Sequence, residues 1–177
     1  MQKLATPEEL LAQLSEKLRT LLTEKAIDNP LMVGIHTGGS WIATRLYQQL
    51  NSEQQIFKDP LASLDISFYR DDFSRIGMNP KVKPSDIPSD VEDRHIILVD
   101  DVLHTGRTIR AAMNELFDYG RPASITLVCL LERSGRELPL QADIVGQSLA
   151  LKEGEHIKLT GPEPLALELK QIKDSET

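Results

Sequence analysis

The apolar residues near the start of the chain recur at the spacing of an amphipathic helix. Thr6 is a candidate N-cap, Pro7 suits the first helical turn, and Glu9 completes a capping box. The apolar stripe that follows consists of Leu10, Leu14, Leu18, Leu21 and Leu22. The motif DNP at residues 28–30 then ends the segment. We predict one helix ahead of the first strand.

Three apolar runs lack the polar alternation of a half-exposed strand. They are residues 31–35 (LMVGI), 95–99 (HIILV) and 124–131 (SITLVCLL). Such runs are typical of strands that are covered on both faces of a sheet. Helical patterns follow the first two runs, one capped by Ser40 and one at residues 108–119 that Gly120 ends. This order predicts an α/β protein with a mainly parallel sheet and right-handed crossovers.

The segments outside this pattern are less regular. Residues 63–70 alternate apolar and polar positions, as in a strand with one buried face. The residues that follow, about 71–92, contain prolines, many charges and no period, which suits a lid or binding loop, or a solvated connector. Short apolar pieces in the last third, at residues 142–146, 155–159 and 164–169, predict extra strands or a small flap.

Composition narrows the class of protein. The 177 residues fit a single domain, which we take as residues 1–177. Cys129 is the only cysteine and lies in an apolar run, so we expect an inert core thiol and a reducing compartment. The chain has neither a signal peptide pattern nor an apolar stretch of about 20 residues, so we expect a cytoplasmic protein without a membrane partner. The net charge of −7 argues against general affinity for nucleic acid.

The stretch IILVDDVLHTGRT, residues 96–108, carries the candidate chemistry. Asp100 and Asp101 follow a buried strand, at the edge where open α/β sheets bind ligands. The next residues, Thr105 to Thr108, lead into a helix, whose first N–H groups favour an anion. Gly106 allows close approach and Arg107 adds a cation. A phosphate cradle beside two carboxylates suits a ribose 5-phosphate, although aspartates at such a turn can also serve only as caps.

Two other nucleotide-binding motifs are missing from the chain. It contains no G-x-x-x-x-G-K-[ST] sequence and no dinucleotide fingerprint. Successive strand residues face opposite sides of a sheet, so we do not expect Asp100 and Asp101 to do identical jobs.

The thirteen residues resemble the phosphoribosyl pyrophosphate signature of type I phosphoribosyltransferases. The wider resemblance is to the PyrR family, which pairs uracil phosphoribosyltransferase activity with regulation of pyrimidine operons. It covers VGIHTGGSWIATRL, LDISFYRDDFS, IILVDDVLHTGRTIRAAMNELFDYGRPASITLVCLLER and RELPLQADIVGQ. The resemblance implies a parallel sheet flanked by helices and a small hood subdomain from about residue 133 onward. The implied reaction joins N1 of uracil to C1 of the sugar as pyrophosphate leaves, giving UMP.

The resemblance also implies roles for individual residues. Asp100 and Asp101 would serve the ribose hydroxyls and the water shell of a Mg²⁺ ion, which would be held mainly through substrate and water. Thr105, Gly106, Arg107 and Thr108 would hold the 5-phosphate, and Val102, Leu103 and His104 just before them are further expected substrate-binding residues. Thr37 and Gly38 resemble the pyrophosphate loop, where the family has a cis peptide. Arg70 would meet pyrophosphate, or is a surface arginine, and Arg133 and the backbone of Ile157 match base-binding positions.

The chain departs from the family at two site positions. Gly38 stands where many relatives carry arginine, so one positive charge near pyrophosphate is missing. His104 stands where the better-known PyrR proteins are aromatic and purine phosphoribosyltransferases have an aspartate. It either assists proton transfer or merely lines the turn. His36, His95 and His156 are scattered without the spacing of metal ligands.

Alternatives remain open for function and partners. We expect an enzyme that acts on phosphoribosyl pyrophosphate and uracil and forms a homodimer or higher homo-oligomer. RNA binding has little support, because the first helix mixes Lys17, Arg19 and Lys25 with four glutamates. The alternatives are a nucleotide-sensing regulator with little turnover, and a phosphoribosyltransferase for a different base.

Overall fold

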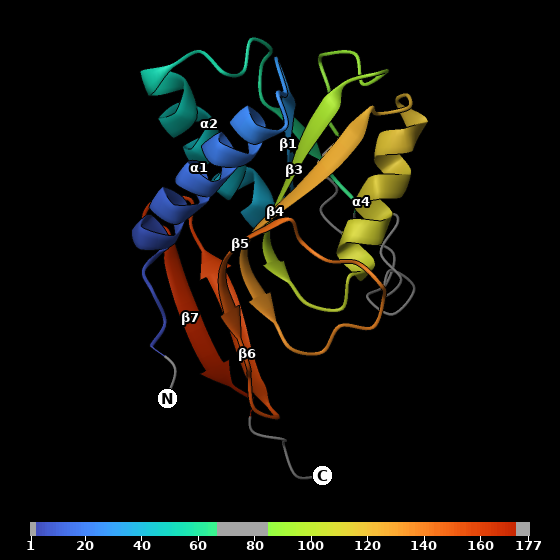
Figure 1. Ribbon diagram of the computed structural model, residues 1–177. Helices are drawn as coiled ribbons and strands as arrows, with labels where there is room; N and C mark the ends of the chain where they lie inside the picture. The colour runs from blue at the N-terminus through green and yellow to red at the C-terminus, as the bar shows by residue number, and fades with distance from the viewer. Residues whose placement is uncertain (1–2, 67–84, 173–177) are drawn as a thin grey trace.

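Five parallel strands form the centre of the protein (Figure 1). The structure is a computed structural model that describes residues 3–66 and 85–172. The strand order is β2-β1-β3-β4-β5, and each neighbouring pair is parallel. The strands are β1 (Leu31–Ile35), β2 (Ala62–Leu64), β3 (His95–Leu103), β4 (Ser124–Arg133) and β5 (Ile144–Leu149). The predicted parallel α/β sheet is confirmed.

Helices cover both faces of this sheet. On β3, Ile97 and Val99 pack in one core cluster with the leucines of α1 (Pro7–Glu24) and α2 (Gly38–Glu53). Ile96 and Leu98, which point the other way, pack in a second cluster with α4 (Arg107–Asp118). Because alternate residues face opposite layers, an apolar strand without polar alternation is what a doubly covered sheet requires.

The first helix begins where its sequence predicts. The hydroxyl of Thr6 accepts a hydrogen bond from the N–H of Glu9 at 3.2 Å, and the Glu9 carboxylate accepts one from the N–H of Thr6 at 2.9 Å. This capping box satisfies N–H groups that the first turn cannot pair internally.

Two element boundaries differ from the predictions. α2 begins at Gly38 rather than after Ser40, and the Ser40 hydroxyl contacts the carbonyl of Gly34 and Nδ1 of His36. β3 continues to Leu103, so Asp100 and Asp101 lie within the strand, and Asp100 pairs with Cys129 of β4. Of the strand predicted at residues 63–70, β2 includes 63 and 64, and residues 67–70 lie outside the described part.

The residues after β4 divide between two sheets. β5 joins the main sheet, whereas β6 (Glu155–Thr160) and β7 (Ala166–Gln171) form a separate antiparallel pair. This hairpin lies beyond the ends of β3 and β4 (Figure 1), and Arg133, the last residue of β4, reaches the backbone of Glu155. It therefore lies at the carboxyl edge of the main sheet.

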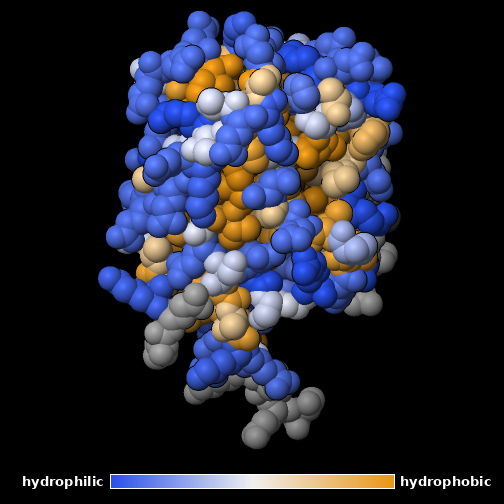
Figure 2. Space-filling view, in the orientation of Figure 1, coloured by the Kyte–Doolittle hydropathy of each residue, from blue (hydrophilic) through white to orange (hydrophobic). Residues whose placement is uncertain are grey.

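One face of the molecule has an apolar area with hydrophilic surroundings. Figure 2 shows hydrophobic side chains between α1 and α4, over β4 and β5, with hydrophilic residues around them. Phe117 of α4 and its C-cap Tyr119 are 54% and 44% exposed. Within residues 3–66 and 85–172, none of the helices has the length and apolar character that a membrane span needs.

Candidate functional site

Asp100 and Asp101 lie side by side near the carboxyl end of β3, in different surroundings. Asp100 is only 4% exposed, and its Oδ1 accepts a hydrogen bond from the backbone N–H of Asp101 at 2.9 Å. Asp101 is half-buried. The buried carboxylate therefore braces the backbone at the position from which the more accessible one projects.

The first turn of α2 packs directly against these aspartates. A Cβ atom at Gly38 would overlap the Asp101 carboxylate, and one at Gly39 would overlap the carbonyl of Val99 and the backbone of Asp100. Thr37, the N-cap, is exposed and follows a cis peptide bond from His36. A cis peptide bond is thus present in the turn where the family resemblance predicts one. Sequence reasoning missed Gly39, and the doubled glycine in HTGGS was its signal.

The first turn of α4 forms the second boundary of the site. Gly106, its N-cap, has φ +92°, a conformation that favours glycine. The Thr105 hydroxyl accepts a hydrogen bond from the N–H of Arg107 at 3.2 Å. The Thr105 carbonyl accepts two more, from the N–H groups of Glu137 and Leu138 at 3.0 and 3.1 Å. The loop after β4 therefore supports this turn from behind.

The helices around the site differ from α1 in their N-termini. Neither Thr37 of α2 nor Gly106 of α4 forms a side-chain cap, whereas α1 has a complete capping box. The first N–H groups of a helix carry partial positive charge and bind anions readily. Two such helix ends beside two carboxylates can hold a ligand that has an anionic group at each end and hydroxyl groups between them.

Several of the predicted substrate-binding residues contact other parts of the protein. The Arg107 side chain forms an ion pair with Glu137, with Nε and Oε2 2.8 Å apart, and both are substantially exposed. The side chain of Leu103 is buried in the core, and that of Val102 packs against the other core cluster. Thr108 is half-buried in the first turn of α4. Val102 and Leu103 can reach a ligand only through their backbone.

A third group of residues lies between the site and the β6–β7 hairpin. The imidazole of His104 packs on Gly135, where a Cβ would lie 2.8 Å from Nε2. Burial first, and then the nearby Arg133, lowers the pKa of His104. The Nε of Arg133 is buried without a hydrogen-bond partner in the described part of the chain. Ile157 of β6 is buried nearby in the core. A neutral ring and an unsatisfied donor therefore lie at the hood.

The acidic pair is the part of this site that suits a hard cation. Carboxylate oxygens are the ligands that Mg²⁺ prefers, and it commonly binds through one or two of them plus water and phosphate. No group of three or more potential ligands occurs in the parts of the chain that the structure describes. His95 contacts Ser124 and His36 contacts Ser40 through Nδ1. Arg70 lies outside the described residues.

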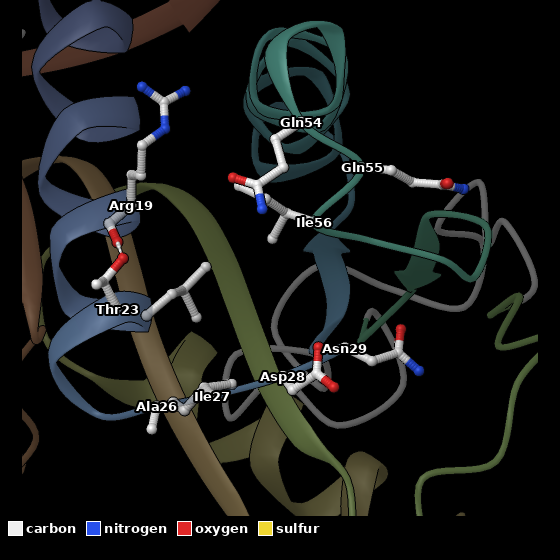
Figure 3. A pocket seen from close by; sticks show the side chains of 10 residues that line it. Arg19, Thr23, Ala26, Ile27, Asp28, Asn29, Gln54, Gln55 and Ile56 are labelled. Carbon is white, nitrogen blue, oxygen red and sulfur yellow. Dashed lines mark hydrogen bonds between the residues drawn. The ribbon is translucent and has the colours of Figure 1, made fainter.

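A pocket of about 330 Å³ lies away from this site (Figure 3). Its lining comes from the C-terminal ends of α1 and α2 and from Asp28 and Asn29, which precede β1. Arg19 in its wall pairs with Glu53, and the Thr23 hydroxyl donates to the carbonyl of Arg19. None of the predicted site residues lines this pocket.

Cys129 is fully buried and lies beside Asp100 in the sheet register. Burial, and then the charges of Asp100 and Asp101, raises the pKa of its thiol well above the usual range. The expected inert core thiol is confirmed.

Known proteins resemble this chain over most of its length. A family model described as the phosphoribosyl transferase domain matches residues 6–159. A protein of Nitrosococcus oceani named "Bifunctional protein PyrR" is 56% identical over 167 residues, which cover 94% of this chain and 93% of the relative. A protein of the same name from Pseudomonas aeruginosa is 53% identical and covers 97% of this chain and 98% of its own length.

Solved structures agree in fold. The hypoxanthine phosphoribosyltransferase of Trypanosoma cruzi superimposes with a TM-score of 0.63 at 23% identity, over 82% of this chain and 80% of that one. At this level of identity the likeness concerns the arrangement of helices and strands alone.

Proposed function

Because this chain belongs to the PyrR family of phosphoribosyltransferases, we propose that it converts uracil and phosphoribosyl pyrophosphate to UMP and pyrophosphate. One observation carries the assignment of the site. Two helix N-termini without side-chain caps flank Asp100 and Asp101 at the carboxyl edge of the sheet. This arrangement fits a sugar with a phosphate at one end and pyrophosphate at the other.

Each of the two helix N-termini binds one anionic group of the substrate. The first turn of α4, from Thr105 to Thr108, holds the 5-phosphate, because no side chain caps its first N–H groups and Gly106 supplies the positive φ of the turn. The first turn of α2, at Thr37 and Gly38, receives pyrophosphate. As the bond from C1 to pyrophosphate breaks, negative charge grows on the leaving group, and the N–H groups of α2 stabilise that charge. Gly38 supplies no side-chain cation to assist them.

The aspartates hold the sugar between these ends. Asp101, the more accessible carboxylate, accepts hydrogen bonds from the ribose hydroxyls, and Asp100 keeps its backbone in place. The pair would also hold the water shell of Mg²⁺, which supplies positive charge to the departing pyrophosphate. The fit of a hard cation to two adjacent carboxylates supports this assignment.

The base lies under the β6–β7 hairpin. Arg133 has a buried Nε–H without a partner within residues 3–66 and 85–172, and it reaches β6, the strand of Ile157, at the carbonyl of Glu155. Uracil oxygens would therefore find donors here. Uracil must lose the proton of N1 when N1 bonds to C1. His104 has a lowered pKa, so its neutral ring can accept that proton near neutral pH.

The test is a panel of uracil, orotate, hypoxanthine and guanine, each incubated with phosphoribosyl pyrophosphate and Mg²⁺. We expect UMP from uracil and little product from the other bases. Nucleotide formed chiefly from another base would assign a different phosphoribosyltransferase, which His104 keeps as an alternative. If no base yields a nucleotide, the remaining hypothesis is a regulator that binds nucleotides with little turnover.

Regulation of a pyrimidine operon is the second function we propose, because the relatives are named bifunctional. The structure offers this function limited electrostatic support. On α1, Lys17 donates to the carbonyl of Val145 and Arg19 pairs with Glu53, so both cations have internal partners. A gel shift with pyrimidine-operon leader RNA at several salt concentrations tests it. No shift at low salt would remove RNA from the list of partners.

We also propose a cytoplasmic homo-oligomer, a dimer or larger. The apolar area between α1 and α4 in Figure 2 supports a contact between chains. The exposed side chains of Phe117 and Tyr119 add further apolar surface. Light scattering would give the mass, and a monomer at micromolar concentration would contradict the proposal.

A further inference from the structure

Glu115 is a buried carboxyl group that the proposed reaction does not use. It lies on α4, is 8% exposed, and its Oε2 has no hydrogen-bond partner among residues 3–66 and 85–172. Its Oε1 forms a short hydrogen bond with the hydroxyl of Ser85. Burial raises the pKa of Glu115; the bond from Ser85 opposes this, and the neighbouring acids Asp65 and Asp118 add to it.

Ser85 connects Glu115 to the end of β2. The N–H of Asp65 donates to the Ser85 hydroxyl at 2.9 Å, and the carbonyl of Asp65 lies 3.4 Å from the same oxygen. Ser63 and Asp86 exchange two backbone hydrogen bonds of 2.8 and 2.9 Å beside it. We call Ser63, Asp65, Ser85 and Asp86 the β2 clasp, because they join two stretches of chain into one unit.

Whether Glu115 is protonated decides how many of these polar groups have a hydrogen-bond partner. A neutral Glu115 donates its proton to the Ser85 oxygen, and Ser85 then donates its own proton to the carbonyl of Asp65. An ionised Glu115 instead accepts the hydrogen bond that the Ser85 hydroxyl donates. The Asp65 carbonyl then loses the Ser85 hydroxyl as its donor. It also leaves a buried carboxylate with an unpaired oxygen beside two other acids, which is unfavourable. The geometry therefore favours the neutral acid.

We propose that Glu115 is a positioning residue that, as a neutral acid, fastens the β2 clasp to α4. The first turn of the same helix forms the proposed 5-phosphate site. The hydrogen bond between Glu115 and Ser85 therefore fixes this site relative to β2. The kinetic part of this inference rests on the proposed function, because it concerns how tightly the cradle holds the 5-phosphate.

The test compares three variants with the natural protein. Glu115→Gln keeps an N–H donor for Ser85, Glu115→Ala removes the donor, and Asn114→Ala is a matched truncation of an exposed, uncharged side chain on the same helix. We expect Glu115→Ala to raise the KM for phosphoribosyl pyrophosphate about tenfold, as for one lost buried hydrogen bond, with kcat less affected. Glu115→Gln should restore the KM, and Asn114→Ala should leave it unchanged.

The pH profile separates positioning from a merely structural role. In the natural protein the KM should rise as increasing pH ionises Glu115, whereas in Glu115→Gln this part of the profile should be absent. A KM for Glu115→Ala equal to that of the natural protein, in a variant that folds, would overturn the inference. So would identical pH profiles for the natural protein and Glu115→Gln.

Two measurements do not depend on turnover. The affinity for ribose 5-phosphate, measured by calorimetry, should fall in Glu115→Ala and return in Glu115→Gln even if no base is a substrate. The carbon-13 NMR signal of the Glu115 carboxyl group, assigned by its loss in Glu115→Gln, should titrate at a higher pH than a free glutamate side chain. Titration at or below the pH of a free glutamate side chain would refute the neutral acid. Failure to form UMP, with these two results intact, would refute only the proposed function.

Discussion

Asp100 and Asp101 show how two identical side chains acquire different tasks. The strand directs the two side chains to opposite faces of the sheet. The buried Asp100 carboxylate accepts a hydrogen bond from the N–H of Asp101, while the Asp101 carboxylate faces the first turn of α2. Replacing Asp101 should therefore reduce activity, and replacing Asp100 should also disturb the backbone.

Asp101→Asn should lower kcat/KM by about a hundredfold or more, because the amide cannot supply the negative charge that the sugar hydroxyls and Mg²⁺ meet. Its free energy of unfolding should change by only about 0.5 kcal/mol, as for other half-exposed positions. Steady-state kinetics and urea unfolding check the two values. Asp28→Asn, at an exposed acid before β1, is the control; equal losses of activity and stability in Asp101→Asn would count against a catalytic role.

His104 is a residue whose surroundings could not be read from the sequence. Its packing on Gly135 and its proximity to Arg133 bring together residues from the ends of two strands. Since the pKa of the ring is lowered, a base role predicts that kcat stays high at neutral and alkaline pH and falls at acidic pH as the ring is protonated. His104→Phe should remove this acid limb from the profile. An unchanged profile would leave His104 as a residue that lines the turn.

At the scale of elements, the sequence predicts most helices and strands because each has a clear apolar period. The boundaries at the site are less predictable. The end of β3 reads as Val99 from hydrophobicity, yet pairing with β4 continues through the aspartates to Leu103. The start of α2 depends on Gly39, which lets the helix lie on the backbone of β3. Such boundaries follow from contacts between distant segments, and a local pattern does not contain them.

The turn before α4 gives a prediction at this scale. Gly106→Ala places a Cβ at φ +92° and 3.3 Å from the Cβ of Leu138, so the turn should shift to relieve both. We expect a loss of about 1–2 kcal/mol in the free energy of unfolding and at least a tenfold weaker affinity for ribose 5-phosphate. Calorimetry measures the affinity and thermal unfolding measures the stability. An unchanged affinity for ribose 5-phosphate would contradict the assignment of this turn as the 5-phosphate site.

For the whole molecule, stability against pH should reflect the two carboxyl groups whose pKa values move in opposite directions. The hydrogen bond from Arg94 lowers the pKa of Asp59, so the stability from this pair is present above the unfolded pKa and is lost as pH falls. The pKa of Glu115 is raised, so its contribution is fully present below its unfolded pKa, near 4.5, and is lost as pH rises through its folded value.

Urea unfolding at a series of pH values tests the direction in which each group changes the free energy of unfolding. In Glu115→Gln, the decline of stability between about pH 4.5 and the folded pKa should be smaller than in the natural protein, because the amide has no proton to lose. Asp59→Asn should instead flatten the decline at acidic pH. Parallel curves for all three proteins would mean that neither group contributes.

The single thiol of the chain lies on β4 and can report on opening of the folded protein. Cys129 has no exposed surface and packs in the core cluster on the α4 side of the sheet, so a thiol reagent can modify it only after that layer separates from the sheet. With opening fast compared with labelling, the modification rate reads the free energy of that separation, without an added dye or an engineered residue. Substrates that bridge the helix ends should slow the modification in proportion to their occupancy.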